Sequence, residues 1–588
     1  MKLSRWPLAL VLATLLGCAS TPLPPWPAPT ASAAPTLPAS APAAAPASAP
    51  TEAAVATPVP DTAVPALTPV APAPAASAAV AAESAGVAAR FPDPPVSYST
   101  PAFESGRTSF TSNAELHAFV RGLLNEGAGR AGAPRVRLLA LGSSQKGVTI
   151  EALQFTRADR AAARSTVLLI GQQHGDEPAG AEALLVVAQE LAQGRLPGVL
   201  DRVDVVILPR ANPDGAALEQ RLSASGIDIN RDHLLLRTPE AQAQANLARQ
   251  FDPAVVVDAH EYTALGRWAA KFDAVPAADA LLQYATVANL PPFVTKAAEE
   301  WFRAPLVQRL KSEGLSTDWY HTTSADLNDR QVSMGGVQPD TGRNVGGLRN
   351  AVSLLIETRG IGIGRAHFKR RVFTQVTAIE SVLASAALRA DDLAKLRQYV
   401  AQEVSAQACR GDVVVEAVAT PSEYSLHMLD PASGADKTVA VAWNSALKLD
   451  PLRLRARACG YWLRPDQIDT VMRLRALGVQ VSRFEESGGL RGEIYRETAR
   501  DVGVRSDVRG SVADAGGVLH LKVDLVPALV DVRAGSYYVG LDQPLANLVV
   551  AALEPDTQNS YVAHGILGSV EGEARVLQRP ELRMSPMP

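Results

Sequence analysis

Four apolar runs constrain the fold of this chain more than any other feature of its sequence. They read "STVLLIGQQ" (165–173), "VDVVILPRANP" (203–213), "AVVVDAHEY" (254–262) and "AVSLLIETRG" (351–360). Near-continuous apolar runs of this length are typical of strands that are buried on both faces of a sheet. An amphipathic helix, "AEALLVVAQELAQG" (181–194), stands between the first two runs. The alternation predicts an α/β domain with a mostly parallel central sheet flanked by helices.

Shorter elements precede and follow these runs. Strands are predicted at "VRLLALGSS" (136–144) and "VTIEALQFT" (148–156), and a helix at 112–127, where Ser112 or Asn113 is placed to cap it. After about residue 405 the chain alternates between predicted strands and one helix, "RPDQIDTVMRLRALG" (464–478). We therefore expect the α/β domain to cover 96–405 and a mixed α+β accessory unit to cover 406–588, in which no chemistry stands out.

The N-terminus has the features of an export signal. Lys2 and Arg5 precede the apolar stretch "WPLALVLATLLG", which is short for a membrane-spanning helix. It ends in "LLGC", which resembles the lipobox of bacterial lipoproteins, so residues 1–17 would be removed and Cys18 would carry lipid. A plain secretory signal is the alternative. Ala19 weakly favours the outer membrane, so we expect a lipid anchor at its periplasmic face.

Residues 18–95 are predicted to be a disordered tether. They consist mainly of Ala, Pro, Ser and Thr, as in "TPLPPWPAPTASAAPTLPASAPAAAPASAP". Such a composition offers almost nothing for a core, and its prolines favour extended segments.

The net charge argues against one class of partner, and the cysteine content allows one disulfide. The net charge is −4 and the basic residues are not clustered, so nucleic acid is excluded as an expected partner. Beyond Cys18, Cys409 and Cys459 are the only cysteines. In an exported protein they could form a disulfide, and two free thiols are the alternative.

Candidate metal ligands follow three of the apolar runs. His174 and Glu177 follow the first, His260 follows "AVVVDA", and Glu357 stands at the end of "SLLI". Sheets of this class bind ligands at the carboxyl ends of their strands. Two histidines and one glutamate form a known catalytic zinc set, which activates water. Glu357 is then suited to act as the general base.

Other interpretations of these residues stay open on the sequence alone. His233, His321 and His367 are alternative third ligands, although none directly follows an apolar run. A buried Glu357 could instead form an ion pair with Arg359 or Arg343.

Six motifs occur in the order found in the zinc metallocarboxypeptidases of the carboxypeptidase A type. They are "HGDE" (174–177), "NPDG" (212–215), Arg221, "GIDINR" (226–231), "DAHEY" (258–262) and "LLIETRG" (354–360). Between about residues 100 and 405 the chain resembles this family, especially its compact bacterial members.

The resemblance implies a role for each matching residue. His174, Glu177 and His260 would bind one Zn²⁺ per chain, and Glu357 would be the general base and acid. Asp228 would accept a hydrogen bond from His174. Arg221 would stabilise the oxyanion of the tetrahedral intermediate. Asn230 and Arg231 would hold the terminal carboxylate of the peptide.

The chain departs from the family pattern in two places. The usual "NRNF" is "NRDH", which brings in Asp232 and His233. The family's mobile tyrosine is missing from "GGVQPDTGRNVGGLRNAV", and Tyr320 is an unaligned candidate for its place. Side-chain specificity therefore cannot be predicted from the sequence.

These features predict a zinc carboxypeptidase that removes the last residue of periplasmic or cell-wall peptides with a free terminal carboxylate. A zinc deacylase of N-acyl amino acids, similar to desuccinylases and aspartoacylases, is one alternative because it shares the His-x-x-Glu…His layout. A peptide-binding relative with little turnover is another, and the missing tyrosine motivates it.

Overall fold

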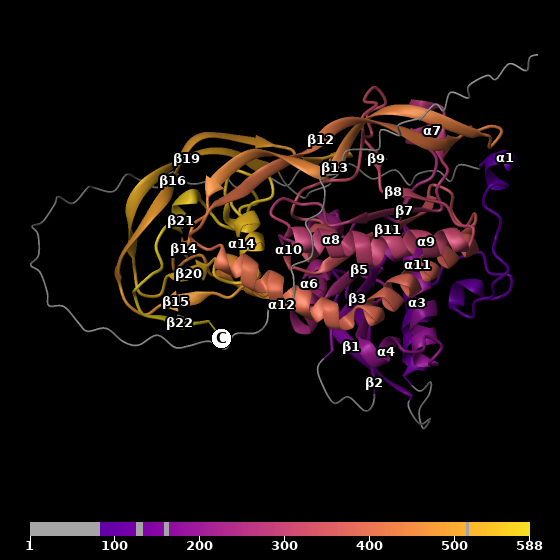
Figure 1. Ribbon diagram of the computed structural model, residues 1–588, viewed down its shortest axis with the longest axis horizontal. Coiled ribbons are helices and arrows are strands. Elements are labelled where there is room, and N and C mark those ends of the chain that lie inside the picture. Colours follow the sequence, from indigo (N-terminus) through magenta and orange to yellow (C-terminus); the bar gives the residue numbers. More distant parts are fainter. Residues whose placement is uncertain (1–82, 125–132, 158–163, 513–516, 588) are drawn as a thin grey trace, which may run out of the picture.

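An eight-stranded sheet forms the centre of the protein in the computed structural model, which describes residues 83–124, 133–157, 164–512 and 517–587 (Figure 1). In spatial order its strands are β1 (Pro134–Ser143), β2 (Thr149–Arg157), β4 (Asp204–Leu208), β3 (Thr166–Gly171), β5 (Val255–Thr263), β11 (Val352–Ile361), β7 (Ala280–Tyr284) and β8 (Thr317–Trp319). Strands β4, β3, β5 and β11 are parallel, and β1, β2 and β7 are joined through antiparallel pairs. The sheet is mixed with a parallel centre, and the predicted α/β class is confirmed.

Helices on both faces explain why the central strands are apolar throughout. Val167 and Leu169 of β3 belong to the core that includes α3 (Pro178–Ala192) and α11 (Phe368–Leu388). Leu168 and Ile170 belong to a second core with α6 (Pro239–Phe251). Because successive side chains of a strand point to opposite faces, two covered faces require apolar residues at every position.

The remaining helices of this domain are short or lie at its periphery. They are α1 (Ala85–Ala88), α2 (Asn113–Leu123), α4 (Val199–Arg202), α5 (Pro213–Ala217), α7 (Arg267–Phe272), α8 (Pro292–Ala297), α9 (Ala304–Ser312), α10 (Gly342–Leu348) and α12 (Ala390–Ala406). Ser112 caps α2: its hydroxyl accepts a hydrogen bond from the Glu115 amide, and the Glu115 carboxylate accepts one from the Ser112 amide. Of the two predicted caps, Ser112 is the one in use.

Two strands continue past the uninterrupted apolar stretches "AVVVDA" and "SLLI". His260, expected just after the first stretch, lies within β5, and Glu357, expected at the end of the second, lies within β11. In the register of these parallel strands the two residues are partners. Strand β5 is paired on both sides, with β3 and β11, so its backbone hydrogen bonding continues past the last apolar residue.

Residues 83–95, which were predicted to be part of the tether, pack against the α/β domain instead. Glu83 forms ion pairs with Arg359 and His367, and Phe91 is buried in a small core that also contains Val275. A composition-based boundary at residue 95 missed this segment because its contacts are with distant parts of the chain. The signal peptide predicted at 1–17 and the tether at 18–82 lie outside the described residues.

Long strands dominate the C-terminal unit, residues 406–587. A seven-stranded sheet contains β19 (Val518–Val532), β16 (Gly488–Gly503), β21 (Glu573–Val576), β14 (Gly460–Leu463), β20 (Tyr537–Gly540), β15 (Ser482–Phe484) and β22 (Met584–Pro586). Helices α13 (Ile468–Ala476) and α14 (Ala546–Leu553) accompany it, and β17 (Ser506–Asp507) pairs with β18 (Gly510–Ser511). The predicted mixed α+β unit is confirmed, with β structure predominating.

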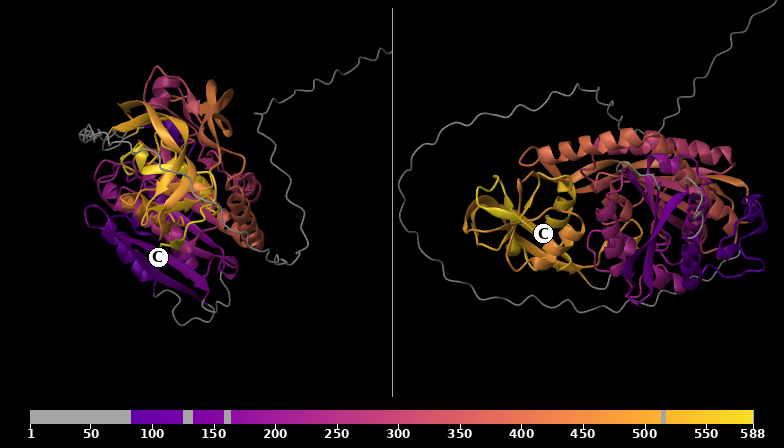
Figure 2. Two further views of the ribbon diagram at one scale, coloured as in Figure 1. Left: turned by 90° about the vertical axis from the view of Figure 1, so that its left-hand side faces the viewer. Right: turned by 90° about the horizontal axis from the view of Figure 1, so that it is seen from below.

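The two units share a sheet and lie side by side (Figure 1, Figure 2). This sheet has the order β6-β12-β13-β10-β9. Strands β12 (Asp412–Leu429) and β13 (Asp436–Ala456) come from the C-terminal unit, and β6 (Val275–Pro276), β9 (Thr322–Thr323) and β10 (Val332–Ser333) from the α/β domain. A disulfide joins Cys409 to Cys459, which settles the pairing that the sequence left open.

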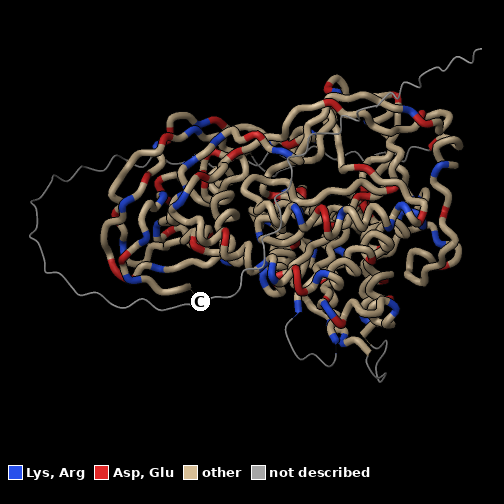
Figure 3. The backbone as a smooth tube through the Cα atoms, viewed as in Figure 1, with Lys and Arg blue, Asp and Glu red and all other residues tan. Residues whose placement is uncertain are grey.

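Lys and Arg are interspersed with Asp and Glu along the described chain of both units (Figure 3). Within the described ranges, none of the helices combines the length and apolar character needed to span a membrane.

Candidate active site

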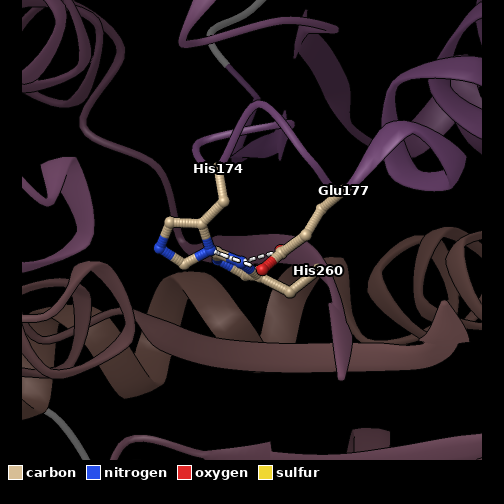
Figure 4. A group of neighbouring side chains, drawn as sticks. All are labelled: His174, Glu177 and His260. Atoms are coloured by element: carbon tan, nitrogen blue, oxygen red, sulfur yellow. Dashed lines mark hydrogen bonds and ion pairs between the residues drawn. The ribbon is translucent and has the colours of Figure 1, made fainter. Parts of the chain in front are cut away.

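Three buried side chains from two strand ends converge on one point (Figure 4). The turn between β3 and α3 carries His174 and Glu177, and β5 carries His260. One oxygen of Glu177 is 2.7 Å from Nδ1 of His174, and the other is 2.7 Å from Nδ1 of His260. The two Nδ1 atoms are 3.1 Å apart. The ligand atoms of all three residues lie within 4.8 Å of one another and could hold a metal ion.

A carboxylate lies behind each imidazole of this triad. Nε2 of His174 is 3.2 Å from Oδ1 of Asp228, as the resemblance implied, and Nε2 of His260 is 2.8 Å from Oδ1 of Asp258. Such contacts orient a ligating imidazole and increase its basicity. Asp258 was missed in the sequence, although its position two residues before His260 in a strand places both on one face.

The charges of the triad stabilise one another. Burial by itself would raise the pKa of Glu177, but His174 and His260 hold it below its ordinary range. Burial opposes protonation of His260, yet the carboxylates of Asp258 and Glu177 raise its pKa well above the ordinary value. A buried carboxylate held ionised between two imidazoles is an environment suited to a cation.

Glu357 faces the same cavity from β11. Its side chain is buried, and within the described part of the chain it forms no ion pair with Arg343 or Arg359. Burial and the neighbouring Glu177 raise the pKa of Glu357 to about 7. A carboxyl group with a pKa near neutrality can both accept and donate a proton, which is what general acid–base chemistry requires.

Arg221 lies beside the triad and lines the cavity. Its guanidinium donates two hydrogen bonds to Oδ2 of Asp228, from Nε at 3.1 Å and from Nη2 at 2.8 Å. Nη1 is 3.5 Å from Oε1 of Glu177. Asp228 thus orients both His174 and Arg221, and the guanidinium is fixed next to the candidate metal position.

Asn230 and Arg231 also line the cavity, but both already have partners. The amide nitrogen of Asn230 is 3.2 Å from Nε2 of His260, and its oxygen accepts a hydrogen bond from the Gly342 amide. Arg231 donates through Nε at 2.8 Å to Oδ2 of Asp507, which belongs to the C-terminal unit. The proposed carboxylate-binding arginine therefore holds a carboxylate of its own chain.

Tyr320 lies in the cavity, although no motif pointed to it. A Cβ atom built on Gly335 would come within 2.7 Å of its ring, so the ring fills the space next to a residue without a side chain. Burial, followed by the charge of Glu357, raises the pKa of the phenol to about 12. Tyr320 was considered in the sequence as a substitute for the family's tyrosine, and it is the tyrosine that lies beside Arg343.

Several further residues of the cavity carry no signal in the sequence. They are Arg267, Trp268, Arg343, Val508 and Arg509. They come from three distant segments of the chain, so only the fold brings them together.

The alternative histidine ligands do not belong to the metal cluster of the described residues. Nε2 of His233 is 2.7 Å from the side-chain oxygen of Gln173, and Nδ1 of His321 is 2.8 Å from the carbonyl of Trp319. His367 pairs with Glu83. Of the three, His321 lines the cavity, but the metal cluster of the described residues consists of His174, Glu177 and His260.

This donor set fits zinc. Two imidazole nitrogens and one carboxylate leave a coordination position open, which is the arrangement of catalytic zinc sites. Their buried position and the carboxylates behind both imidazoles meet the further requirements of such a site.

Comparison with known sequences identifies the family. A family model described as zinc carboxypeptidase matches residues 130–327. Carboxypeptidase 2 of Trichophyton rubrum is 30% identical over 406 residues, which cover 68% of this chain and 74% of that protein. Carboxypeptidase SOL1 of Arabidopsis thaliana is 31% identical over 123 residues, covering 18% and 25% of the respective chains. Because these relatives are fungal and plant proteins, the bacterial origin expected from the signal stays a prediction.

Solved structures show more distant similarity. A metallo-carboxypeptidase from Pseudomonas aeruginosa is 20% identical with a TM-score of 0.35, over 48% of this chain and 69% of that one. Carboxypeptidase A from Helicoverpa armigera is 14% identical with a TM-score of 0.38, over 48% and 75%. On the strength of the match to Carboxypeptidase 2, the chain belongs to the zinc carboxypeptidase family and is a metallocarboxypeptidase that uses Zn²⁺.

Proposed function

We propose that this protein is an exopeptidase that removes the last residue of peptides with a free terminal carboxylate. The observation that carries the proposal is Glu357, a buried carboxylate without an ion-pair partner among the described residues, which lines one cavity together with His174 and Glu177 of the triad. A general base, a metal site and guanidinium groups in one cavity are the components that metal-assisted hydrolysis of an amide needs.

Each residue contributes a separate part of the reaction. His174, Glu177 and His260 would hold zinc, which supplies Lewis acidity when bound. Glu357 removes a proton from the attacking water and passes it to the nitrogen of the departing residue. Arg221, fixed by Asp228, directs its positive charge to the side of the peptide carbonyl where negative charge develops.

Arg231 is the proposed anchor of the terminal carboxylate, with Asn230 beside it. A planar guanidinium binds a carboxylate through two parallel hydrogen bonds. Its present partner, Asp507, shows that the position accepts a carboxylate. Binding of a peptide end at Arg231 therefore exchanges one carboxylate for another.

Masking the terminal carboxylate tests this function. The zinc-loaded protein should cleave free-acid peptides and lose at least ~10-fold in kcat/KM on the same peptides amidated at the C-terminus, because a neutral amide cannot replace the Asp507 carboxylate at the Arg231 guanidinium. Mass spectrometry of a peptide mixture reports the position of the cut. Equal cleavage of amidated peptides, or internal cleavage, would contradict the proposal.

Two other results would point to the alternative functions. Release of only an acyl group from N-acyl amino acids would identify a deacylase. Tight binding of free-acid peptides to the zinc-loaded protein without any product would identify a peptide-binding protein.

We further propose that lipid on Cys18 anchors the mature protein at the periplasmic face of the outer membrane, where periplasmic or cell-wall peptides would be the substrates. The lipobox-like "LLGC" and the Ala/Pro-rich segment that follows it support this location. A Cys18→Ser variant should remain unprocessed or appear in the soluble fraction after cell fractionation. A processed variant that stayed with the membranes would contradict lipid anchoring.

A further inference from the structure

The cavity beside the metal ligands is rich in arginine. Five guanidinium groups line it: Arg221, Arg231, Arg267, Arg343 and Arg509. Two of them are neutralised by the protein, since Arg221 pairs with Asp228 and Arg231 pairs with Asp507.

Arg343 is the buried member of the set that forms no ion pair with any described residue. It lies on α10 and is 5% exposed. Its Nη2 donates to the carbonyl of Gly336 at 2.8 Å, whereas its Nε is buried without a hydrogen-bond partner. Among the described residues no carboxylate lies within ion-pair distance of Arg343. Burial lowers its pKa to about 10, so the group is still a cation at neutral pH.

The other residues that line the cavity add positive charge, and few carboxylates among them are available to balance it. Within the described ranges Arg267 and Arg509 also form no ion pair, and Nη1 of Arg267 donates to the carbonyl of Thr323. Three carboxylates of the described residues line the cavity: Glu177 is held by the two histidines, Glu261 by Arg371, and Glu357 attracts Arg343 from beyond ion-pair distance. With Arg267, Arg343 and Arg509 all outside ion pairs, the unpaired positive groups still outnumber this one carboxylate. A buried, unpaired charge is costly, so a cavity of this composition favours an anionic ligand.

We propose that the protein prefers peptides whose last residue has a carboxylate side chain, glutamate or aspartate, and that Arg343 is the residue that binds this side chain. The inference rests on the proposed function, because it concerns the last residue of the peptide. Such a residue carries two carboxylates. Arg231 is the anchor for the terminal carboxylate. Arg343, a second guanidinium in the same cavity, is available to bind the side-chain carboxylate.

The chemistry of the guanidinium group makes this preference specific. A side-chain carboxylate can accept two parallel hydrogen bonds from Arg343, including one from the unpartnered Nε. The side-chain amide of glutamine has the same shape as the carboxylate of glutamate but carries no charge. Its NH2 group would face an N–H donor of Arg343 and could not accept a hydrogen bond from it. An aliphatic side chain would leave the cation buried and unpaired.

The test compares peptides that differ only in the last residue: Glu, Gln, Asp, Asn, Leu or Lys. With the zinc-loaded full chain we expect kcat/KM for the Glu peptide to exceed that for the Gln peptide at least ~10-fold. Arg343→Gln should abolish this ratio, because kcat/KM should fall for Glu, whereas kcat/KM for Leu should rise once no cation is left unpaired beside its side chain. Arg343→Lys should retain part of the preference, since it keeps the charge but not the planar fork.

Arg349→Gln is the matched control. Arg349 is also buried and follows α10 directly, but its Nη2 donates to the carbonyl of Ala248 and it does not line the cavity. This variant should keep the full preference for Glu over Gln.

Two results would overturn the inference. One is an equal kcat/KM for the Glu and Gln peptides in the unaltered protein, which needs no variant to fold. The other is an equal loss on all peptides in Arg343→Gln, which would make Arg343 a second anchor of the terminal carboxylate. Calorimetric binding of the Glu and Gln peptides makes the same comparison without turnover. A protein that cleaves nothing but binds Glu peptides more tightly would contradict the proposed function and support the pocket.

Discussion

At the scale of single residues, the site is organised by pairs of a charged group and the group that orients it. Asp258 lies behind His260, and Asp228 lies behind both His174 and Arg221. Glu357 differs because it has no such partner in the described structure. Its carboxyl group therefore combines a raised pKa with freedom to reach a water molecule, which are the properties of a base rather than of a ligand.

The pH dependence of activity should follow the ionisation of Glu357. Burial and Glu177 raise its pKa from the ordinary value of 4.5 to about 7. The positive charge of bound zinc opposes this shift, so the pKa in the working enzyme should lie between these values. Only the ionised form is a base, so kcat/KM should rise with pH through this pKa. An acid limb with a midpoint above 7 or below 4.5 would contradict the assignment.

The variant Glu357→Gln tests the same assignment by removing the ionisable group. It should retain zinc, measured by elemental analysis, and lose ~10²–10⁴-fold in turnover, the usual contribution of a positioned proton-transfer group. A zinc-loaded variant with nearly unchanged rates would remove Glu357 from the mechanism.

At the scale of elements, paired strands position the site, and one disulfide links two segments of the C-terminal unit. The register of β5 and β11 makes His260 and Glu357 partners, so a shift of either strand would separate the base from the metal ligands. In the C-terminal unit, Cys409 follows α12 and Cys459 precedes β14, and their disulfide closes a loop with a sequence separation of 50.

Loss of this disulfide should destabilise the protein without altering the metal site. In the chain-entropy account, a bond that closes a loop of this length restricts the unfolded chain, and removal of a native disulfide typically costs ~2–5 kcal/mol. We expect Cys409→Ser with Cys459→Ser to unfold at lower denaturant concentration while binding a full equivalent of zinc. Equal unfolding midpoints for the variant and the unaltered protein would show that the bond is not stabilising.

At the scale of the whole molecule, the C-terminal unit contributes to the cavity of the α/β domain. The hairpin of β17 and β18 brings Asp507 to Arg231, and Val508 and Arg509 complete the wall. Arg505 fixes the base of this hairpin by an ion pair with Asp340 of the α/β domain. The accessory unit, in which the sequence showed no chemistry, therefore carries residues that line the cavity.

Asp507 should compete with the substrate for Arg231. In Asp507→Asn the guanidinium loses its internal carboxylate, so KM for free-acid peptides should fall several-fold, up to ~10-fold, with a smaller change in kcat. The matched control is Asp524→Asn, which removes an exposed ion pair with Arg496 in the same unit. An increase of KM in Asp507→Asn would show instead that Asp507 positions Arg231 for binding.

The sequence by itself determined the central strands, the α/β class and the residues of the metal cluster. Hydrophobic periodicity is a local property, and so is the spacing of His174 and Glu177 on one turn. The order of the motifs then singled out His260 among the remaining histidines. These features could be predicted because each depends on neighbours in the chain or on the regular geometry of a sheet.

Only the tertiary structure decided the electrostatics of the cavity. Arg231 and Asp507 are separated by 276 positions, and no local pattern indicates that they meet. The same holds for Tyr320 against Gly335 and for Nε of Arg343, which has no hydrogen-bond partner among the described residues. Whether a buried charge is paired depends on which distant side chains the packing brings within a few ångströms, because Coulomb and desolvation energies change steeply over that distance.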